Sequence, residues 1–315
     1  MSMALIAASH SPLLVKAELP PAGDIQDRVE QAFGAVRKFA HDYQPTLLVI
    51  FAPDHYNGFF QDLMPPFCIG TAARAVGDYD TLSGPVSVRE DYALDMVEYV
   101  QKQGIDMPYS RAMVVDHGVA QPLEELFGTL SPLPIIPVFV NGVAPPWVPV
   151  ERIRRMGQAV GSYLETLDER VLVIASGGLS HDPPLPRWDE TDDAGREFLL
   201  EGRNPTPEFR AARQANVIKG AAAFARGLSP IIDLNPAWDS DFMDRCASGD
   251  PTRFDTYSIE EMTREAGHSV HECRTWVGAF SALSAAGPYD VSFRFYEPIR
   301  EFIAGFGIMS AQTKA

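Results

Sequence analysis

Four of the seven histidines in this chain follow apolar runs of the kind that form buried strands, or lie in a short loop with glycine. They are His10, His55, His117 and His181. In an open α/β sheet, ligands bind at the carboxyl ends of the strands. Imidazole is the commonest metal-binding side chain, and its ordinary pKa lies near neutrality. Several imidazoles at one edge of a sheet therefore predict a metal site with acid–base partners.

Two of these histidines follow the strands of one predicted strand–helix–strand unit. His10 comes soon after residues 4–8, and His55 comes soon after residues 47–51. A lone histidine in such a place is more often a loop-capping residue than a ligand, but two at neighbouring strand ends make the two interpretations about equally good. Asp54 is either a group that orients an imidazole or a simple loop acid.

The most specific short motif is Ser-Gly-Gly-Leu-Ser-His over residues 176–181. Two glycines after a buried strand permit positive φ and close backbone approach, which would hold His181 at the edge of the sheet. A tight turn accounts for the glycines but not for the histidine. His117, in an Asp-His-Gly loop, supplies the fourth imidazole.

A third metal ligand should be anionic if the metal is non-haem Fe(II), because its usual triad is two histidines and one carboxylate. Glu272 lies among mostly uncharged residues in a stretch predicted to be helical, residues 266–276. His268 and Glu272 would share a face of that helix, and His268 or His271 is an alternative ligand. Spacing alone does not choose among the 42 Asp and Glu residues.

Several other chemistries lack their motifs. The chain has no Gly-x-Ser-x-Gly segment, so a serine hydrolase of the nucleophile-elbow type is disfavoured. It has neither GxGxxG nor GxxxxGK[ST], so dinucleotide and P-loop nucleotide sites are also disfavoured. A net charge of −16 argues against nucleic acid as a partner, because phosphate binding needs a basic surface.

Expected strands and helices alternate along the chain and must position these residues. This order predicts an α/β fold with a central, mostly parallel sheet flanked by helices. The C-terminal half is more helical, and residues 1–315 are expected to form one domain. The expected strands are residues 4–8, 46–52, 135–140, 171–175 and 293–295. The expected helices are residues 24–42, 86–103, 150–167, 209–228 and 259–283. Residues 56–88 are expected to be loops near the substrate, and the tail from Gly307 is expected to fray.

Composition predicts an ordinary cytoplasmic protein. The hydrophobic content is 46%, and no apolar run approaches the roughly 20 residues that span a bilayer. The first residues carry no basic segment typical of a secretory signal. Three cysteines, without CxxC spacing, fit a reducing compartment better than a disulfide scaffold or a zinc finger.

Together these motifs resemble those of the class III extradiol ring-cleavage dioxygenases, the superfamily of the protocatechuate 4,5-dioxygenase β subunit. The resemblance extends over nearly the whole chain. It is carried by residues 8–12, 52–55, 116–118, 176–181 and 272–276. It implies that His10, His55 and Glu272 hold Fe(II), that His181 is the proton acceptor, and that His117 is the proton donor.

Within the superfamily, the length and the motifs are most similar to members that act on 3-(2,3-dihydroxyphenyl)propionate and 2,3-dihydroxycinnamate. This implies extradiol cleavage of such a catechol by O2 in aromatic catabolism, in a homo-oligomer without membrane or nucleic-acid partners. Two alternatives stay open: another catechol such as protocatechuate, gallate or DOPA, or a non-catalytic metal-binding relative. The residue that would bind the propionate carboxylate is not indicated by the sequence.

Overall fold

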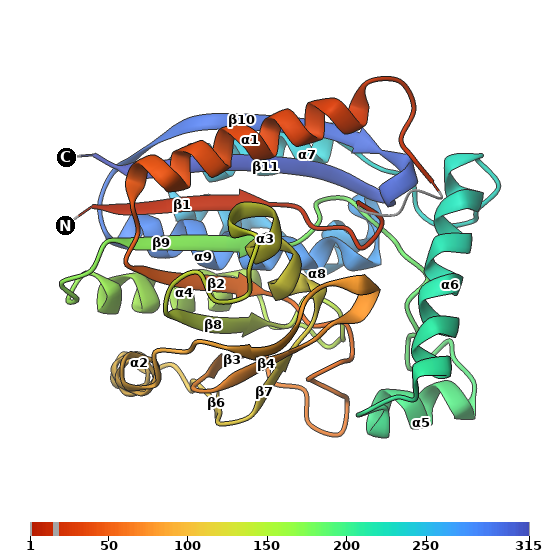
Figure 1. Ribbon diagram of the computed structural model, residues 1–315, viewed down its shortest axis with the longest axis horizontal. Helices are drawn as coiled ribbons and strands as arrows, with labels where there is room; N and C mark the ends of the chain where they lie inside the picture. Colours follow the sequence, from red (N-terminus) through yellow and green to blue (C-terminus); the bar gives the residue numbers. More distant parts are fainter. Residues whose placement is uncertain (1, 15–18, 315) are drawn as a thin grey trace.

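The structure is a computed structural model that describes residues 2–14 and 19–314. Its centre is an eight-stranded sheet (Figure 1). The strands are β1 (Met3–Ala8), β2 (Leu47–Ala52), β3 (Phe67–Gly70), β6 (Tyr109–Ser110), β8 (Ile135–Val140), β9 (Val171–Ser176), β10 (Tyr289–Ile299) and β11 (Ala304–Thr313). Their order across the sheet is β10-β11-β1-β9-β2-β8-β3-β6.

The four central strands β1, β9, β2 and β8 are parallel and buried along their whole length. Strands covered on both faces have near-continuous apolar sequences, which is why these four were visible as apolar runs. Their carboxyl ends are in register: Ala8 lies opposite Ser176, and Phe51 lies opposite Ala175. Loops that leave these strands therefore begin side by side.

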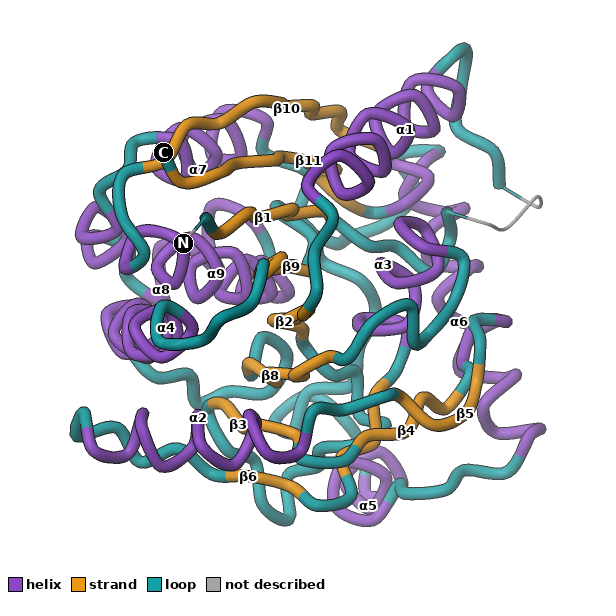
Figure 2. The backbone as a smooth tube through the Cα atoms, turned by 60° about the vertical axis from the view of Figure 1, so that its left-hand side comes forward, coloured by secondary structure: helices purple, strands orange, loops and turns teal. Residues whose placement is uncertain are grey.

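Helices cover both faces of the sheet, and alternate strand residues enter two different cores. Leu5 belongs to one core and Ile6 to the other. One face carries α1 (Ile25–Tyr43) and α3 (His117–Phe127), whereas the other carries α9 (Arg274–Ala285) with α4 (Val150–Leu164) packed beside it. Figure 2 shows these two layers on opposite sides of the strands. The sheet is thus positioned by its two apolar faces, which leaves only its edges and strand ends for function.

The remaining helices include one that stands across the strand ends. Figure 1 shows α6 (Pro207–Ala225) beyond the tips of the β1, β9, β2 and β8 arrows. The other helices are α2 (Glu90–Lys102), α5 (Asp193–Glu201), α7 (Pro236–Ala247), α8 (Ile259–Ala266) and the 3₁₀ helices η1 (Asp78–Asp80), η2 (Pro251–Thr256), η3 (His268–Cys273) and η4 (Arg300–Phe302). Within the described ranges, no helix combines the length and apolar character needed to cross a bilayer.

The chain also forms a second, three-stranded sheet, and two of its strands fall where the sequence predicted loops. This sheet consists of β5 (Ser83–Val86), β4 (Ala73–Val76) and β7 (Met113–Val115), in that order. The expectation of loops over residues 56–88 is therefore wrong for β3, β4 and β5. All three strands are only four residues long, and β4 and β5 are also half exposed, so they lack the apolar runs that mark buried strands.

The tail from Gly307 does not fray, contrary to the expectation. It is part of β11, which pairs with β10 on one side and with β1 on the other, as in the pair Ile308 with Ala8. Ile308 and Met309 are fully buried. Proximity to the end of the chain did not predict fraying correctly, because hydrogen bonding and burial decide whether a terminal segment is ordered.

The helices expected over residues 259–283 are confirmed as three: α8, η3 and α9. Gly267 has a φ of 94°, a left-handed conformation that ends α8. The next residues form η3, with a 3₁₀ pitch of three residues per turn, before α9 begins. His268 and Glu272 therefore do not share a helical face at four-residue spacing, as the sequence pattern had suggested. The other predicted helices are confirmed with shifted ends.

Candidate metal centre

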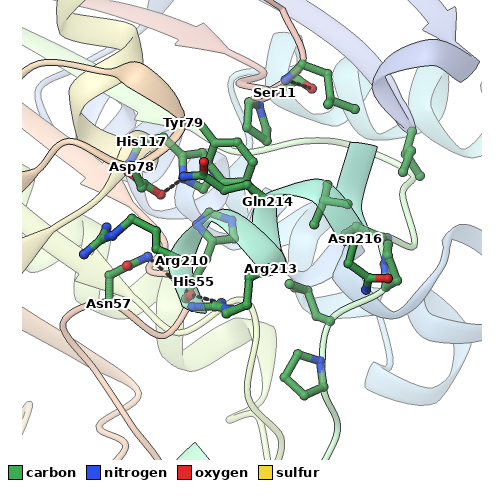
Figure 3. Close-up of a pocket in the computed structure, with 18 of the residues that line it drawn as sticks. Ser11, His55, Asn57, Asp78, Tyr79, His117, Arg210, Arg213, Gln214 and Asn216 are labelled. Atoms are coloured by element: carbon green, nitrogen blue, oxygen red, sulfur yellow. Dashed lines mark hydrogen bonds and ion pairs between the residues drawn. The ribbon is translucent and has the colours of Figure 1, made fainter. Parts of the chain in front are cut away.

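A cavity of about 310 Å³ opens at the carboxyl ends of the central strands. Its lining includes all five residues singled out in the sequence: His10, His55, His117, His181 and Glu272. Figure 3 shows His55 and His117 at this cavity, with side chains from α6 facing them. Residues up to 262 positions apart are thus brought to one place, as the strand-end argument predicted.

His10 follows β1 and is held through one ring nitrogen. Its Nδ1 lies 2.8 Å from Oγ of Ser176, at the end of the neighbouring strand β9. Its Nε2 faces Glu272, 3.5 Å from Oε2. Burial lowers the pKa of His10 to about 3, although the Glu272 carboxylate opposes this effect. The imidazole is therefore neutral at physiological pH, which is the state that binds metal.

His55 follows β2 and is held by Asp116. The Asp116 Oδ2 atom accepts the backbone N–H of His55 at 2.7 Å and lies 3.1 Å from its Nδ1. This leaves Nε2 of His55 facing Oε1 of Glu272 at 3.2 Å. A carboxylate on the far nitrogen is the usual partner of a metal-binding histidine, because it fixes the tautomer and the ring orientation.

The sequence left open whether Asp54 orients an imidazole or only stabilises its loop, and the structure shows that it stabilises the loop. Its carboxylate accepts the backbone N–H groups of Asn57, Gly58 and Phe59. It therefore closes the loop after β2 rather than orienting an imidazole. Asp116 performs the orienting role instead, and it also caps α3 by accepting the N–H of Gly118 at 2.9 Å.

Charges in the cluster are strongly coupled. Burial would lower the pKa of His55, but the carboxylates of Asp116 and Glu272 outweigh it and raise that pKa well above its usual value. Burial would likewise raise the pKa of Glu272, but His181 and His55 outweigh it and hold that pKa well below its usual value. Glu272 is thus an ionised carboxylate that is 2% exposed, and a buried charge of this kind requires cationic partners.

Glu272 is seated by close backbone approaches. A Cβ on Gly177 would lie 2.7 Å from the Glu272 carbonyl oxygen, and a Cβ on Gly142 would lie 2.7 Å from its Cα. From the sequence, Gly177 and Gly178 were expected to permit positive φ and close backbone approach. Neither is among the residues with positive φ, so the reason is close approach.

The two alternative histidine ligands face away from the cavity. His268 has its Nδ1 at 2.9 Å from Asp182, and His271 has its Nε2 at 2.9 Å from Oγ1 of Thr263. The His271 ring stacks on Trp147, with 3.8 Å between centroids. Neither histidine is among the lining residues of the cavity.

The donor set around Glu272 fits a divalent transition metal. Two imidazole Nε2 atoms, from His10 and His55, face one carboxylate, and each Nδ1 is already bonded to a protein group. Two histidines and one carboxylate are the facial donor set of non-haem Fe(II) sites. A second grouping is also compatible with a metal, because ligand atoms of His10, His55 and His117 lie within 4.8 Å of one another.

His181 ends the Gly-Gly loop after β9. Its Nδ1–H is donated to the carbonyl oxygen of Leu179 at 2.8 Å, so Nε2 is the nitrogen left for proton exchange. Nε2 lies 2.9 Å from Oε1 of Glu272. Burial would lower the pKa of His181, but Glu272 and the Leu179 carbonyl outweigh it and raise the pKa.

His117 is the first residue of α3 rather than part of a loop, and it is 3% exposed. Asp78 accepts its backbone N–H at 2.8 Å and lies 2.6 Å from its Nδ1. The His117 ring stacks on His55, with 4.3 Å between centroids, and Tyr79 packs edge-on against it at 5.1 Å. Figure 3 shows Asp78 bonded to His117.

Sequence reasoning missed Asp78, Asp116 and Tyr79 as residues of the site. Asp116 stood inside the quoted Asp-His-Gly motif, and its place before a helix is an N-cap signal. Asp78 and Tyr79 carried no signal in the sequence, since the left-handed φ of Tyr79 at 50° is seen only in the structure. Non-glycine residues with such strain cluster at functional sites.

The family model described as the catalytic LigB subunit of aromatic ring-opening dioxygenase matches residues 4–307 of this chain.

Three relatives resemble this chain over nearly its full length. Each relative is a 2,3-dihydroxyphenylpropionate/2,3-dihydroxicinnamic acid 1,2-dioxygenase. The protein of Rhodococcus globerulus is 51% identical over 311 residues, covering 99% of this chain and 98% of that protein. That of Rhodococcus rhodochrous is 52% identical over 313 residues, with coverages of 99% and 98%. That of Mycolicibacterium paratuberculosis is 49% identical over 315 residues, with both chains covered completely at 100%.

One solved structure, of an uncharacterized Escherichia coli K12 protein, covers 99% of this chain and 100% of its own. It is 12% identical, and its TM-score of 0.46 is too low to support an argument about this protein.

Proposed function

The chain belongs to the family of catalytic LigB subunits of aromatic ring-opening dioxygenases, and from this we propose that it cleaves the ring of 3-(2,3-dihydroxyphenyl)propionate and of 2,3-dihydroxycinnamate. The cleaved bond lies beside the diol, one O2 is consumed, and both oxygen atoms enter the product. The observation that carries the proposal is the convergence of four histidines and Glu272 in one cavity. Identities of about 50% over the whole chain support the substrate class.

In this proposal, His10, His55 and Glu272 hold Fe(II). When bound, Fe(II) supplies a centre that acidifies the catechol hydroxyls and transfers charge between catechol and O2. The neutral His10, the ionised Glu272 and the Asp116-oriented His55 support this assignment.

His181 and His117 take the two proton-transfer roles. Nε2 of His181 is the accepting atom for a catechol hydroxyl proton, because its Nδ1–H is committed to Leu179. Nε2 of His117 donates a proton during cleavage, because Nδ1 of that ring is engaged by Asp78. Proton transfer by a positioned side chain contributes about 10²- to 10⁴-fold to a rate.

The walls of the cavity suit an aromatic substrate. Much of the lining is apolar. It comes from the loop after β1, the loop before α5, α5 itself, α6 and the η4 region: Leu13, Pro183, Pro184, Leu185, Phe198, Phe209, Val217, Phe302 and Ile303. Ligand sites commonly combine such walls with a few convergent polar groups. An apolar wall also keeps bulk water away from the site, so that charges inside it interact more strongly.

A substrate panel tests the proposal. The protein is reconstituted anaerobically with Fe(II), and kcat/KM is measured for 3-(2,3-dihydroxyphenyl)propionate, 2,3-dihydroxycinnamate, protocatechuate, gallate and DOPA. We expect the first two to be the best substrates. A higher kcat/KM for one of the other catechols would reassign the substrate within the family. Bound metal without cleavage of any catechol would indicate a non-catalytic relative.

We also infer a cytoplasmic protein, because Cys68, Cys246 and Cys273 are all free and buried. Unpaired thiols are typical of a reducing compartment. The homo-oligomer expected from the resemblance stays a prediction, which analytical ultracentrifugation can test.

A further inference from the structure

Two arginines of α6 line the cavity beside the histidine cluster. They are Arg210 and Arg213, and no other Lys or Arg belongs to the described lining of the cavity. They lie one helical turn apart, so both side chains leave the same side of α6. Figure 3 shows both near Asn57 and His55, on one side of the cavity.

Arg213 is held in place without being neutralised. Its Nη2 donates to the carbonyl oxygen of His55 at 3.2 Å, and its guanidinium lies over the Phe198 ring at 4.3 Å from the centroid. Among the residues that the structure describes, it forms no ion pair with a carboxylate. A guanidinium is charged at neutral pH, and Asp78, Asp116 and Asp54 attract it only from beyond ion-pair distance.

Arg210 has a hydrogen-bond donor without a partner. Its Nη1 is a buried nitrogen with no hydrogen-bond partner. Buried donors are nearly always paired, so an orphan donor at a cavity requires an explanation such as an absent ligand. Arg210 also forms no ion pair within the described part of the chain. By contrast, Arg203 and Arg196, from the same region, pair with Asp62 and Asp193.

We propose that Arg213, assisted by Arg210, binds the side-chain carboxylate of the substrate and thereby selects propionate- or acrylate-bearing catechols. The inference rests on the proposed function and adds the specificity residue that the sequence did not indicate. A guanidinium presents several N–H donors in a planar fork that matches a carboxylate. The carboxylate would satisfy the orphan donor of Arg210 and neutralise the partly buried charge of Arg213.

Arg213 also lies close to the proposed metal site. It donates to the carbonyl oxygen of His55, a proposed metal ligand, and both residues line the same cavity. In both substrates the carboxylate is separated from the ring by two carbons. A substrate held by its diol at the metal and by its carboxylate at Arg213 has its ring fixed at two ends, against the apolar wall that includes Phe198.

The test compares a charged substrate with an uncharged one of the same length. KM and kcat are measured for 3-(2,3-dihydroxyphenyl)propionate and for 3-propylcatechol in the wild type, Arg213→Gln, Arg213→Lys and Arg210→Gln. We expect Arg213→Gln to raise KM for the propionate about 10- to 100-fold, as for loss of a hydrogen-bonded charge pair. KM for 3-propylcatechol should change less than about twofold. KM for the propionate in Arg213→Lys should lie between the values of the wild type and Arg213→Gln, because lysine keeps the charge but lacks the planar fork of donors.

The matched control is Arg226→Gln, because Arg226 is an exposed arginine at the end of the same helix and does not line the cavity. It should leave both KM values unchanged. Iron content is measured in every variant, so that displacement of His55 is recognised separately. Equal losses for both substrates in Arg213→Gln, or equal KM values for both in the wild type, would overturn the inference.

A binding measurement separates this inference from the proposed function. The metal-free protein is titrated calorimetrically with 3-phenylpropionate and with 3-phenylpropan-1-ol, neither of which can be cleaved. Tighter binding of the acid, lost in Arg213→Gln, would support the carboxylate site even if no catechol were turned over. Equal binding of acid and alcohol would refute it, even if ring cleavage were observed.

Discussion

At the level of single residues, one feature unites the four histidines of the site. Each has its Nδ1 engaged by a protein group: Ser176 for His10, Asp116 for His55, Asp78 for His117 and the Leu179 carbonyl for His181. Each therefore has Nε2 as the nitrogen left for chemistry. The rings differ in role because they have different partners and positions around Glu272, rather than because they differ in exposure.

Replacing the histidines should separate metal binding from proton transfer. His10→Ala and His55→Ala should lose Fe(II), because each removes one of three ligands. His181→Ala and His117→Ala should keep Fe(II) and lower kcat by about 10²- to 10⁴-fold, the usual contribution of a general base or acid. Metal analysis beside steady-state kinetics distinguishes the two groups. A His181→Ala variant with most of its activity would show that the proton acceptor is another residue.

Asp78 should matter through His117 alone. In Asp78→Asn, the side-chain amide would meet Nδ1 of His117 where a carboxylate now lies 2.6 Å away, so the favoured tautomer and the orientation of the ring would change. We expect kcat to fall about 10²-fold, at the low end for loss of acid catalysis, with Fe(II) content unchanged. Kinetics and metal analysis check both expectations. Loss of metal in this variant would place His117 among the ligands.

At the level of elements, loops of different origin deliver the site residues. His10, His55 and His181 leave the adjacent strands β1, β2 and β9, whereas His117 begins α3 after the small second sheet. Glu272 comes from η3, on the face of the sheet covered by α9. Because parallel strands in register end together, the loops that carry the first three histidines begin side by side.

Glu272 should depend on the glycines against which it is packed. Gly177→Ala would place a Cβ 2.7 Å from the Glu272 carbonyl oxygen, so backbone must shift. We expect a loss of about 1–3 kcal/mol in the free energy of unfolding, together with weaker Fe(II) binding. Gly34→Ala in α1 is the control, because no atom lies within 4 Å of that Cβ and the substitution should stabilise a helix. Unchanged Fe(II) affinity in Gly177→Ala would contradict this account of Glu272.

The loop that carries His181 is tied to α7 by Asp239. This buried carboxylate accepts the N–H of Ser180 at 2.7 Å, the hydroxyl of Ser180 at 2.6 Å and the hydroxyl of Tyr296 at 2.6 Å. The amide in Asp239→Asn can replace only part of this acceptor set, so we expect a loss of about 1–3 kcal/mol in stability.

The stability difference between the wild type and Asp239→Asn should decrease as the pH rises. Burial raises the pKa of Asp239 above 3.8, so the folded protein binds this proton more tightly than the unfolded chain. The contribution of Asp239 is therefore greatest below pH 3.8 and declines as the pH rises through its folded pKa. Urea unfolding of wild type and Asp239→Asn across the acidic range measures this. A stability difference that grew with pH would contradict the raised pKa.

Sequence alone predicted the parts of the site that follow apolar runs. The buried strands before His10, His55 and His181 are such runs because both faces of the sheet are covered. The pattern could not reveal Asp78 or Arg213, since their partners in the site lie 39 and 158 positions away. It also missed the short half-exposed strands of the second sheet and misjudged β11, whose burial depends on β1 at the other end of the chain.

At the level of the whole molecule, the site lies between a rigid sheet and a covering helix. Figure 1 shows α6 standing across the open ends of the central strands. The sheet side contributes the imidazoles and Glu272, and the α6 side contributes Arg210 and Arg213. Placing chemistry on the sheet and carboxylate recognition on the helix explains how a net charge of −16 is compatible with an anionic substrate.

The most direct test of the central claim is the fate of oxygen. The anaerobically Fe(II)-loaded protein is mixed with 3-(2,3-dihydroxyphenyl)propionate and ¹⁸O2, and oxygen uptake, the visible spectrum and the product mass are recorded together. The account predicts one O2 consumed per catechol, a yellow ring-opened product, and two ¹⁸O atoms in each product molecule. Oxygen uptake without ring opening, or no uptake despite bound iron, would contradict it.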